Sequence, residues 1–337
     1  MTKPIIVAEL SANHNQDFEI AKKSILAIKE CGADAIKLQT YTPECLTLNS
    51  QESYFQINSG TLWDGKTLWE LYKEAYTPWE WHQELFELAK KIGIKIFSSP
   101  FSIKALDFLE SLDCEMYKIA SFEITDTELI YHTAKTKKPI IISTGIATEE
   151  EIQEAIDTCK QAGNENITLL KCTSAYPAPI KEANLLSMIK LGEKYGVKYG
   201  LSDHTQGNLS PIIATTLGAT IIEKHFILDS SINTPDSAFS MDKIAFKKMV
   251  EQINECIIIL GEKNPSIDIE KFKNNRKFAR SLFVSQDIKK GEILNTNNIR
   301  SIRPNNGIPP KYLKEIIGKK ATQNLKFGKP LEFGDFI

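Results

Sequence analysis

Short apolar, β-branched segments recur along the chain, and an amphipathic stretch follows each of them. The amphipathic stretches repeat apolar residues at helical spacing, as at Ala21, Ile25 and Ile28, and therefore predict helices. The apolar segments predict eight strands, at residues 5–8, 35–39, 95–98, 116–119, 139–143, 167–170, 197–202 and 220–224. Eight strands alternating with helices over about 260 residues are typical of an α/β protein with a (β/α)8 TIM barrel.

A doubly wound open sheet is the structural alternative to a barrel. The sequence disfavours it because no G-x-G-x-x-G motif follows a predicted strand, and because the strand spacing is nearly regular. Local signals agree with the predicted helices, since Thr148 and Glu151 have the spacing of a capping box at the start of one of them. We therefore expect residues 1–261 to form one catalytic barrel.

One interval between strands is unusually long. About 55 residues separate the second and third predicted strands, and all four tryptophans of the chain lie among them. An insertion at residues 41–78 could form a lid or a wall of a substrate pocket. It could equally be a helical excursion that packs on its own aromatic residues or on another subunit.

The character of the chain changes after Gly261. Residues 262–280 are polar and predict a linker with a short helix. This charged run is too short to form a nucleic-acid-binding patch. Residues 281–337 predict short strands and turns, which form a small β-rich domain. A domain of this size has a marginal core, so we expect it to dock on a partner surface.

Composition and charge exclude several classes of protein. The 337 residues include 41 Lys and Arg against 43 Asp and Glu, and a net charge of −2 argues against a nucleic-acid partner. No apolar run approaches the ~20 residues that span a bilayer, and the N-terminus lacks the pattern of a signal peptide. Six scattered cysteines are typical of reduced thiols, so we expect a cytoplasmic protein without a membrane partner.

Every predicted strand ends in polar residues, and these ends meet at one mouth of a barrel, where function collects. They are Glu9; Lys37 and Gln39; Ser98 and Ser99; Lys118, Ser121 and Glu123; Ser143 and Thr144; Lys171, Thr173 and Ser174; Ser202 and His204; Glu223 and His225.

Two histidines and two lysines suggest the chemistry of this mouth. Strand alternation places His204 beside Ser202, and His225 beside Glu223, on the same faces of neighbouring strands. Two imidazoles with open positions suit a catalytic divalent metal such as Mn, Co or Mg. Lys37 and Lys118, with hydroxyls nearby, suit a phosphate or carboxylate, although ordinary salt bridges with Glu9 and Glu123 are an alternative. The combination suggests carbon–carbon bond chemistry on an anionic substrate. His82 and His132 follow helical patterns and are predicted to lie at the surface.

Longer motifs carry a resemblance to a known family. They are AELSANHNQD, AIKLQTYTPE, IFSSPF, MYKIASFEITD, IISTGIAT, LLKCTSAYPAP, GLSDHT, IIEKHF and SIRPNNGIPPKYL. In these motifs the chain resembles the bacterial nonulosonic (sialic-type) acid synthases from about residue 4 to residue 337. The resemblance implies a TIM barrel joined to a C-terminal antifreeze-like (SAF) domain, a domain-swapped homodimer, and condensation of phosphoenolpyruvate with an open-chain amino sugar.

The resemblance also implies roles for individual residues. His204 and His225 would hold the divalent metal, and Glu9 and Glu123 would carry out general acid–base catalysis. The predicted phosphoenolpyruvate contacts are Lys37, Ser99, Lys118, Ser121, Ser174 and Ser202, and Ser143 is a further predicted substrate contact. Ser174 ranks lowest among them, because the sialic acid synthase branch has Asn there. The predicted sugar contacts are Gln39, Tyr176, Asp236 and, from the partner subunit's small domain, Arg303.

Within the family, the strings KLQTYTPE, TPWEWH, CTSAYPAP and PDSAFS resemble most the pseudaminic acid synthase branch. The implied acceptor is 2,4-diacetamido-2,4,6-trideoxy-L-altrose, a diacetamido-trideoxy hexose. The same chemistry on N-acetylmannosamine or on the legionaminic acid precursor is the alternative. A non-catalytic carbohydrate-binding protein is an alternative of another class, which the histidines and lysines at the strand ends disfavour.

Overall fold

The structure is a computed structural model that describes residues 2–58, 60–262 and 270–337. The chain divides into two compact units, residues 1–263 and 264–337. Residues 263–269, within the predicted linker, lie outside the described part of the chain. Each unit is described by itself below.

The first unit is a closed barrel of eight parallel strands, ordered β1 to β8 around the ring. β8 closes on β1, where Val7 pairs with Glu223 and Glu9 with His225. The predicted barrel and all eight of its strands are thereby confirmed, and the open sheet is wrong. The strands are β1 Ile5–Glu9, β2 Ala35–Thr40, β3 Lys95–Pro100, β4 Tyr117–Ile119, β5 Ile140–Ser143, β6 Ile167–Cys172, β7 Lys198–Asp203 and β8 Ile221–His225.

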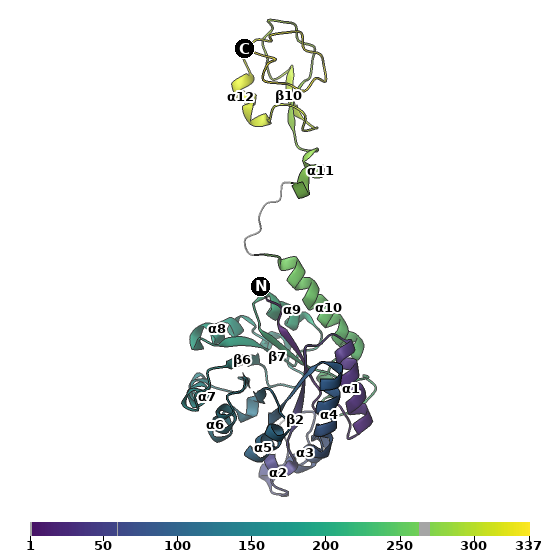
Figure 1. Cartoon of the computed structure of the whole chain (residues 1–337), viewed down its shortest axis with the longest axis vertical. Coiled ribbons are helices and arrows are strands. Elements are labelled where there is room, and N and C mark those ends of the chain that lie inside the picture. Colours follow the sequence, from purple (N-terminus) through teal and green to yellow (C-terminus); the bar gives the residue numbers. More distant parts are fainter. Residues whose placement is uncertain (1, 59, 263–269) are drawn as a thin grey trace. The chain divides into compact units, whose positions relative to one another are not determined.

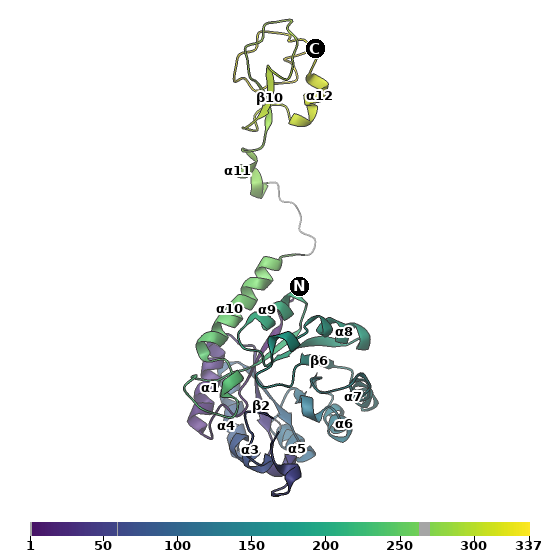
Figure 2. The same ribbon diagram turned by 180° about the vertical axis from the view of Figure 1, so that it is seen from behind.

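Helices surround this ring in the two opposite views of Figures 1 and 2. The predicted capping box at the start of α7 is present, since the Thr148 amide donates to Glu151 Oε2 at 2.7 Å. No helix within the described ranges has the length and apolarity to cross a membrane. The helices are α1 Phe18–Glu30, α4 Trp79–Ile92, α5 Ile103–Ser111, α6 Thr127–Lys135, α7 Glu149–Gln161, α8 Leu186–Tyr195, α9 Leu209–Thr216 and α10 Lys243–Leu260.

An apolar layer fills the barrel interior one step below the strand ends. Residues two positions apart on a strand share a face. Six buried residues of one hydrophobic cluster lie two positions before a residue that faces the barrel mouth, so they face the barrel interior as well. They are Val7, Ala35, Phe97, Ile141, Leu170 and Ile221. The polar mouth therefore rests on a packed, apolar floor.

The long segment between β2 and β3 contains two short helices, α2 Pro43–Leu46 and α3 Leu68–Ala75, and the 3₁₀ turn η1 Ser53–Phe55. Buried polar contacts fix α4, the last helix of this segment, to the barrel. His82 in α4 contacts Thr40 Oγ1 of β2 at 2.9 Å and is fully buried. The prediction that His82 lies at the surface was wrong, because the imidazole has hydrogen-bonding partners inside the protein. His132 is partly exposed, with 37% of its side chain accessible.

The second unit is built around its own small core, which includes Leu282, Leu294, Ile299 and Leu331. Its regular sheet is limited to an antiparallel pair of strands, in which Ile299 faces Val284 and Ile302 faces Ser281. Single bridges elsewhere replace the additional short strands that the sequence predicted. The elements described are η5 Glu270–Phe272, α11 Lys273–Arg276, β9 Ser281–Val284, β10 Ile299–Ile302, η6 Pro310–Tyr312 and α12 Leu313–Ile316.

Candidate active site

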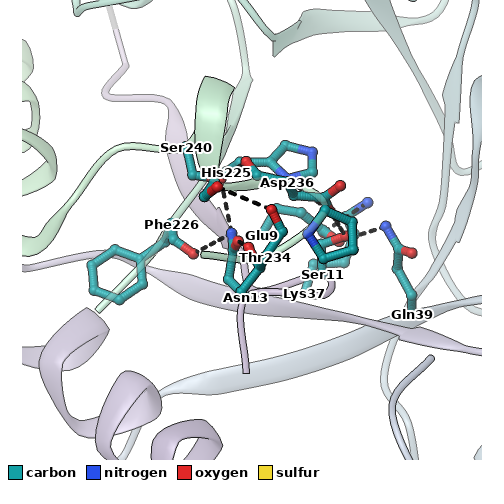
Figure 3. Close-up of polar contacts among 12 residues, drawn as sticks. Glu9, Ser11, Asn13, Lys37, Gln39, His225, Phe226, Thr234, Asp236 and Ser240 are labelled. Carbon is teal, nitrogen blue, oxygen red and sulfur yellow. Dashed lines mark hydrogen bonds and ion pairs between the residues drawn. The ribbon is translucent and has the colours of Figure 1, made fainter. Parts of the chain in front are cut away.

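A buried group of charges lies where β8, β1 and β2 end next to one another. Lys37 Nζ lies 2.9 Å from Glu9 Oε2 and 3.2 Å from Glu223 Oε1. The Gln39 amide donates to Glu9 Oε1 at 3.0 Å, and Ser202 Oγ donates to Glu223 Oε1 at 3.1 Å. The parallel register of the strands brings these residues together, and Figure 3 shows Glu9, Lys37 and Gln39 in contact.

Two carboxylates share one lysine, so the charges of this group differ from those of isolated side chains. Burial raises the pKa of Glu9 to about 7, although Lys37 pulls it downward. Burial also disfavours the Glu223 carboxylate, but Lys37 and Lys118 outweigh burial and lower its pKa below the ordinary value. Burial lowers the pKa of Lys118 to about 8. Glu9 and Lys118 can therefore change protonation state near neutral pH.

The adjoining strand ends present hydrogen-bond donors that have no partner. Ser99 Oγ and Ser143 Oγ are buried and make no hydrogen bond within the described residues. Lys118 Nζ donates to the Ile119 carbonyl at 3.0 Å, a bond that uses one of its three protons. Buried polar atoms are normally satisfied, so unpaired hydroxyls beside a lysine indicate a bound anion.

Ser121 and Ser174 lie side by side at this mouth. Ser174 Oγ donates to Ser121 Oγ at 2.9 Å, and Ser121 Oγ accepts from the Ile146 amide at 3.1 Å. A Cβ built on Gly145 would lie 2.2 Å from Ser174 Oγ, so only glycine allows the serine to occupy this position. The two hydroxyls are thus held together at the mouth.

His204 and His225 meet over the barrel mouth, with their ring centroids 5.3 Å apart. His204 Nδ1 lies 3.1 Å from the Thr173 carbonyl, which can only accept, so Nδ1 carries the proton and Nε2 is free. His225 Nδ1 is buried and has no hydrogen-bond partner in the described part of the chain. Burial lowers the pKa of His225 well below its ordinary value, and His204 adds to this effect.

These features fit a divalent cation, which binds neutral imidazole nitrogens whose other nitrogen is fixed by a carbonyl. The described residues contain no cluster of three or more His, Cys, Asp or Glu side chains able to hold a metal. A metal on His204 and His225 would therefore take its remaining ligands from water or substrate.

A pocket of about 410 Å³ opens above these strand ends. Six predicted site residues line it: Gln39, Ser121, Glu123, Tyr176, His225 and Asp236. The segment between β2 and β3 supplies much of the remaining lining, so it forms a wall of the pocket as well as packing on its own aromatic residues. A larger and shallower groove of about 890 Å³ lies over α6 and α7, away from the strand ends. We therefore place the site in the smaller pocket.

The loop after β8 carries Asp236 to this pocket, and Asn13 holds the loop in place (Figure 3). The Asn13 amide donates to the Phe226 carbonyl at 2.9 Å and to Ser240 Oγ at 2.8 Å, and Thr234 Oγ1 donates to Asn13 Oδ1 at 2.6 Å. Ser11 Oγ donates to Asp236 Oδ2. The predicted sugar contact Asp236 is thus fixed from both ends of its loop.

Most of the predicted site residues lie together at the barrel mouth, but Arg303 does not. Arg303 follows β10 in the second unit and is exposed there. Sequence reasoning assigned no role to Glu223, Ser11 or Asn13. Glu223 had a usable signal, because it lies two positions before His225 and so faces the same way.

Cys172, at the end of β6, is the cysteine beside this histidine pair. Its sulfur lies 3.9 Å from His204 Nδ1. The Cys172 thiol is buried.

Replacing Glu123 with glutamine is expected to raise stability at high pH. Burial raises the pKa of Glu123 from 4.5 to about 7, against the pull of Lys118. The folded state holds this proton more tightly than the unfolded state, so its stabilising effect is present at pH 4.5 and is lost as the pH rises through 7. In the absence of ligands, we expect Glu123→Gln to have a higher Tm than the wild type at pH 8 and nearly the same Tm at pH 5. Glu128→Gln, at an exposed position of α6, is the control; an equal Tm difference at both pH values would contradict the assignment.

Comparisons with known proteins place the chain among relatives that cover most of its length. A family model described as the NeuB family matches residues 24–265, and a SAF domain model matches residues 279–337. The chain is 62% identical to the pseudaminic acid synthase of Helicobacter pylori, over 98% of this chain and 97% of the relative. It is 36% identical to the N,N'-diacetyllegionaminic acid synthase of Campylobacter jejuni, over 97% and 98% of the two chains. A solved N-acetylneuraminic acid synthetase from Leptospira borgpetersenii, in complex with citrate, is similar with a TM-score of 0.71 and 29% identity, over 82% of this chain and 92% of that one.

Proposed function

The chain belongs to the NeuB family, and from this premise we propose that it is a pseudaminic acid synthase. It is a phosphoenolpyruvate-dependent transferase, as the resemblance in its strand-end motifs implied. Its acceptor is 2,4-diacetamido-2,4,6-trideoxy-L-altrose. The identity of 62% to a pseudaminic acid synthase, against 36% to a legionaminic acid synthase, supports this branch.

One observation in the site supports this chemistry most directly. The buried hydroxyls of Ser99 and Ser143, near Lys118, have no hydrogen-bond partner within the described residues. Phosphoenolpyruvate carries about three negative charges, and a mouth with cationic and hydroxyl donors suits it. We assign its binding to Lys37, Ser99, Lys118, Ser121, Ser143, Ser174 and Ser202. Gln39, Tyr176 and Asp236 remain for the hydroxyls and amides of the sugar.

The reaction joins C3 of phosphoenolpyruvate to the aldehyde carbon of the open-chain sugar. Water adds to C2, the C2–O bond to the phosphoryl group breaks, and phosphate leaves. A divalent cation such as Mn, Co or Mg, held by His204 and His225, would polarise the aldehyde as a Lewis acid.

We assign the proton transfers of this reaction to two glutamates of the protein. The pKa of about 7 allows Glu123 to hold or release a proton at neutral pH, and its Oε2 is buried without a partner among the described residues. Glu9, with a pKa of about 7, is the second acid–base group, and Lys37 and Gln39 fix its orientation.

An acceptor assay tests the proposed function. The protein is incubated with phosphoenolpyruvate and, separately, with the L-altrose acceptor, the legionaminic acid precursor and N-acetylmannosamine, and phosphate release is measured. We expect the L-altrose acceptor to have the highest kcat/KM. If N-acetylmannosamine were the best acceptor, the branch would be wrong. If sugars bound without any phosphate release, the protein would be a carbohydrate-binding protein.

We also infer a domain-swapped homodimer, in which Arg303 of one chain reaches the barrel site of its partner. The second unit is small, and Arg303 is exposed on it, which leaves the guanidinium available for the polar groups of a sugar.

In such a dimer, a chain with Arg303→Ala and a chain with His225→Ala together form one intact site, so the two variants should complement each other. Each variant alone should be nearly inactive, whereas a refolded mixture should recover up to about a quarter of the wild-type rate, the share expected from random pairing. A mixture no more active than its components would exclude the swap.

The remaining assignments follow from the same proposal. We assign catalysis to residues 1–261, a linker to 262–280 and the SAF domain to 281–337. The six cysteines are free thiols, which supports a cytoplasmic location, and cell fractionation would test it.

A further inference from the structure

We propose that one wall of the pocket selects the acceptor by its methyl groups. This acceptor wall consists of Leu46, Ile57, Leu68, Leu71 and Ala75, all from the segment between β2 and β3. The inference rests on the proposed function and adds the feature of the sugar that this segment recognises.

The carboxylate and imidazole groups of the pocket lining have a single origin in the chain. They come from the strand ends and the loops after them, and are Glu123, His225 and Asp236. The segment between β2 and β3 contributes the acceptor wall together with Tyr41, Thr61, Trp63 and Tyr72, and none of these side chains is charged at neutral pH. A sugar in this pocket therefore meets carboxylate and imidazole groups from the barrel alone. It meets apolar groups from the segment and also from the barrel loops, where Phe101, Phe122 and Phe239 line the pocket.

Hydrogen bonds hold this segment in place at several points. The Trp63 indole donates to the Pro235 carbonyl at 3.1 Å, which joins the segment to the loop that carries Asp236. The Trp79 indole donates to the Tyr41 carbonyl at 3.1 Å, and the capping box of Thr67 and Glu70 fixes the start of α3. A wall held in this way needs no ordering when the sugar binds, and this favours affinity.

The chemistry of the acceptors matches an apolar wall without carboxylate or imidazole groups. The diacetamido-trideoxy sugar carries three methyl groups, one at C6 and one on each acetamido group. N-acetylmannosamine carries a single acetamido methyl group, a C4 hydroxyl and a C6 hydroxymethyl group. Apolar side chains stabilise a methyl group by burying it, whereas a hydroxyl placed there loses its water without gaining a partner. The acceptor wall therefore favours a sugar with methyl groups on the side that faces α2 and α3.

The acceptor wall responds to the apolar surface of the sugar and not to the configuration of its ring carbons. The legionaminic acid precursor carries the same three methyl groups, so the acceptor wall alone cannot distinguish it from the L-altrose sugar. Discrimination between these two stereoisomers falls to directional groups such as Gln39, Tyr176 and Asp236.

The test compares selectivity in variants of two partly exposed wall residues, Leu46→Ser and Leu68→Ser. The matched control is Leu48→Ser, in the same segment, where the side chain is 67% exposed and does not line the pocket. For each protein, kcat/KM is measured with the L-altrose acceptor and with N-acetylmannosamine, along with KM for phosphoenolpyruvate and Tm. We expect about a tenfold fall in the kcat/KM ratio of the two sugars for either wall variant. The KM for phosphoenolpyruvate should not change, and Leu48→Ser should behave as the wild type.

Other outcomes overturn the proposal. An unchanged ratio in both folded wall variants, with a wild type that prefers the trideoxy sugar, refutes the wall and leaves the proposed function intact. A changed oligomeric state with an unchanged ratio would assign the wall to a protein interface instead. A wild type that uses neither trideoxy acceptor would overturn both proposals.

Discussion

Replacing Lys37 with methionine is expected to lower kcat/KM for phosphoenolpyruvate at least a hundredfold, on the order of the loss of one preorganised donor in an active site. Lys37 is the one cation within ion-pair distance of both Glu9 and Glu223 in the described structure, and all three side chains are buried. Its removal leaves two carboxylates together without their counter-charge. We expect the free energy of unfolding to fall by about 3–5 kcal/mol, the usual cost of breaking a buried ion pair. Steady-state kinetics and urea unfolding measure the two effects.

A matched control separates the two effects. Lys224 is equally buried, and its Nζ lies 2.6 Å from Asp203 Oδ2, on the faces of β7 and β8 that point away from the barrel interior. Lys224→Met should therefore destabilise the fold to a similar extent while the KM for phosphoenolpyruvate stays near the wild-type value. If both variants changed KM equally, Lys37 would have no special role in binding the anion.

The double variant His204→Ala, His225→Ala is expected to retain no divalent metal and to lose about a thousandfold or more in kcat, since Lewis-acid stabilisation contributes several kcal/mol to such reactions. The two rings lie with their centroids 5.3 Å apart at the mouth, and His225 Nδ1 has no hydrogen-bond partner within the described residues, so it is available to bind a metal. Metal content after dialysis is measured by elemental analysis. In the wild type, a chelator should abolish activity, and added Mn or Co should restore it.

His132→Ala is the matched control for this experiment, because His132 is a partly exposed histidine on α6 that contacts Glu128. It should keep both metal and activity. Retained turnover in the double variant would refute the metal site, whatever the effect of the chelator on the wild type.

The fold could be predicted from the sequence because a barrel repeats one local pattern eight times. Each strand is buried on both faces and appears as a short apolar run, such as Ile140–Ser143, and a capped helix follows most of them. The extension of β6 to Cys172 and of β8 to His225 was missed, since polar strand ends look like loops in the sequence.

The candidate site was predictable as a set of residues but not as a set of contacts. Location at a strand end was enough to identify Lys37, Lys118, His204 and His225. Which carboxylates share Lys37 depends on the register between β8, β1 and β2, and a single-residue slip would have turned Glu223 outward. The acceptor wall was missed because α2 and α3 are short and irregular, so no periodicity shows which side chains face the pocket.

The shared lysine of Glu9 and Glu223 has a consequence for how substrate binding is coupled to solvent protons. The site already holds three carboxylates, those of Glu9, Glu123 and Glu223, against Lys37 and Lys118, and the pKa values of Glu9 and Glu123 lie near 7. A trianion bound beside them raises those pKa values further, so the protein must take up protons from the buffer as phosphoenolpyruvate binds. Its affinity should therefore fall as the pH rises through 7, and the binding heat should depend on the ionisation enthalpy of the buffer. The glutamates at the barrel mouth thus gain protons when phosphoenolpyruvate binds, before carbon–carbon bond formation begins.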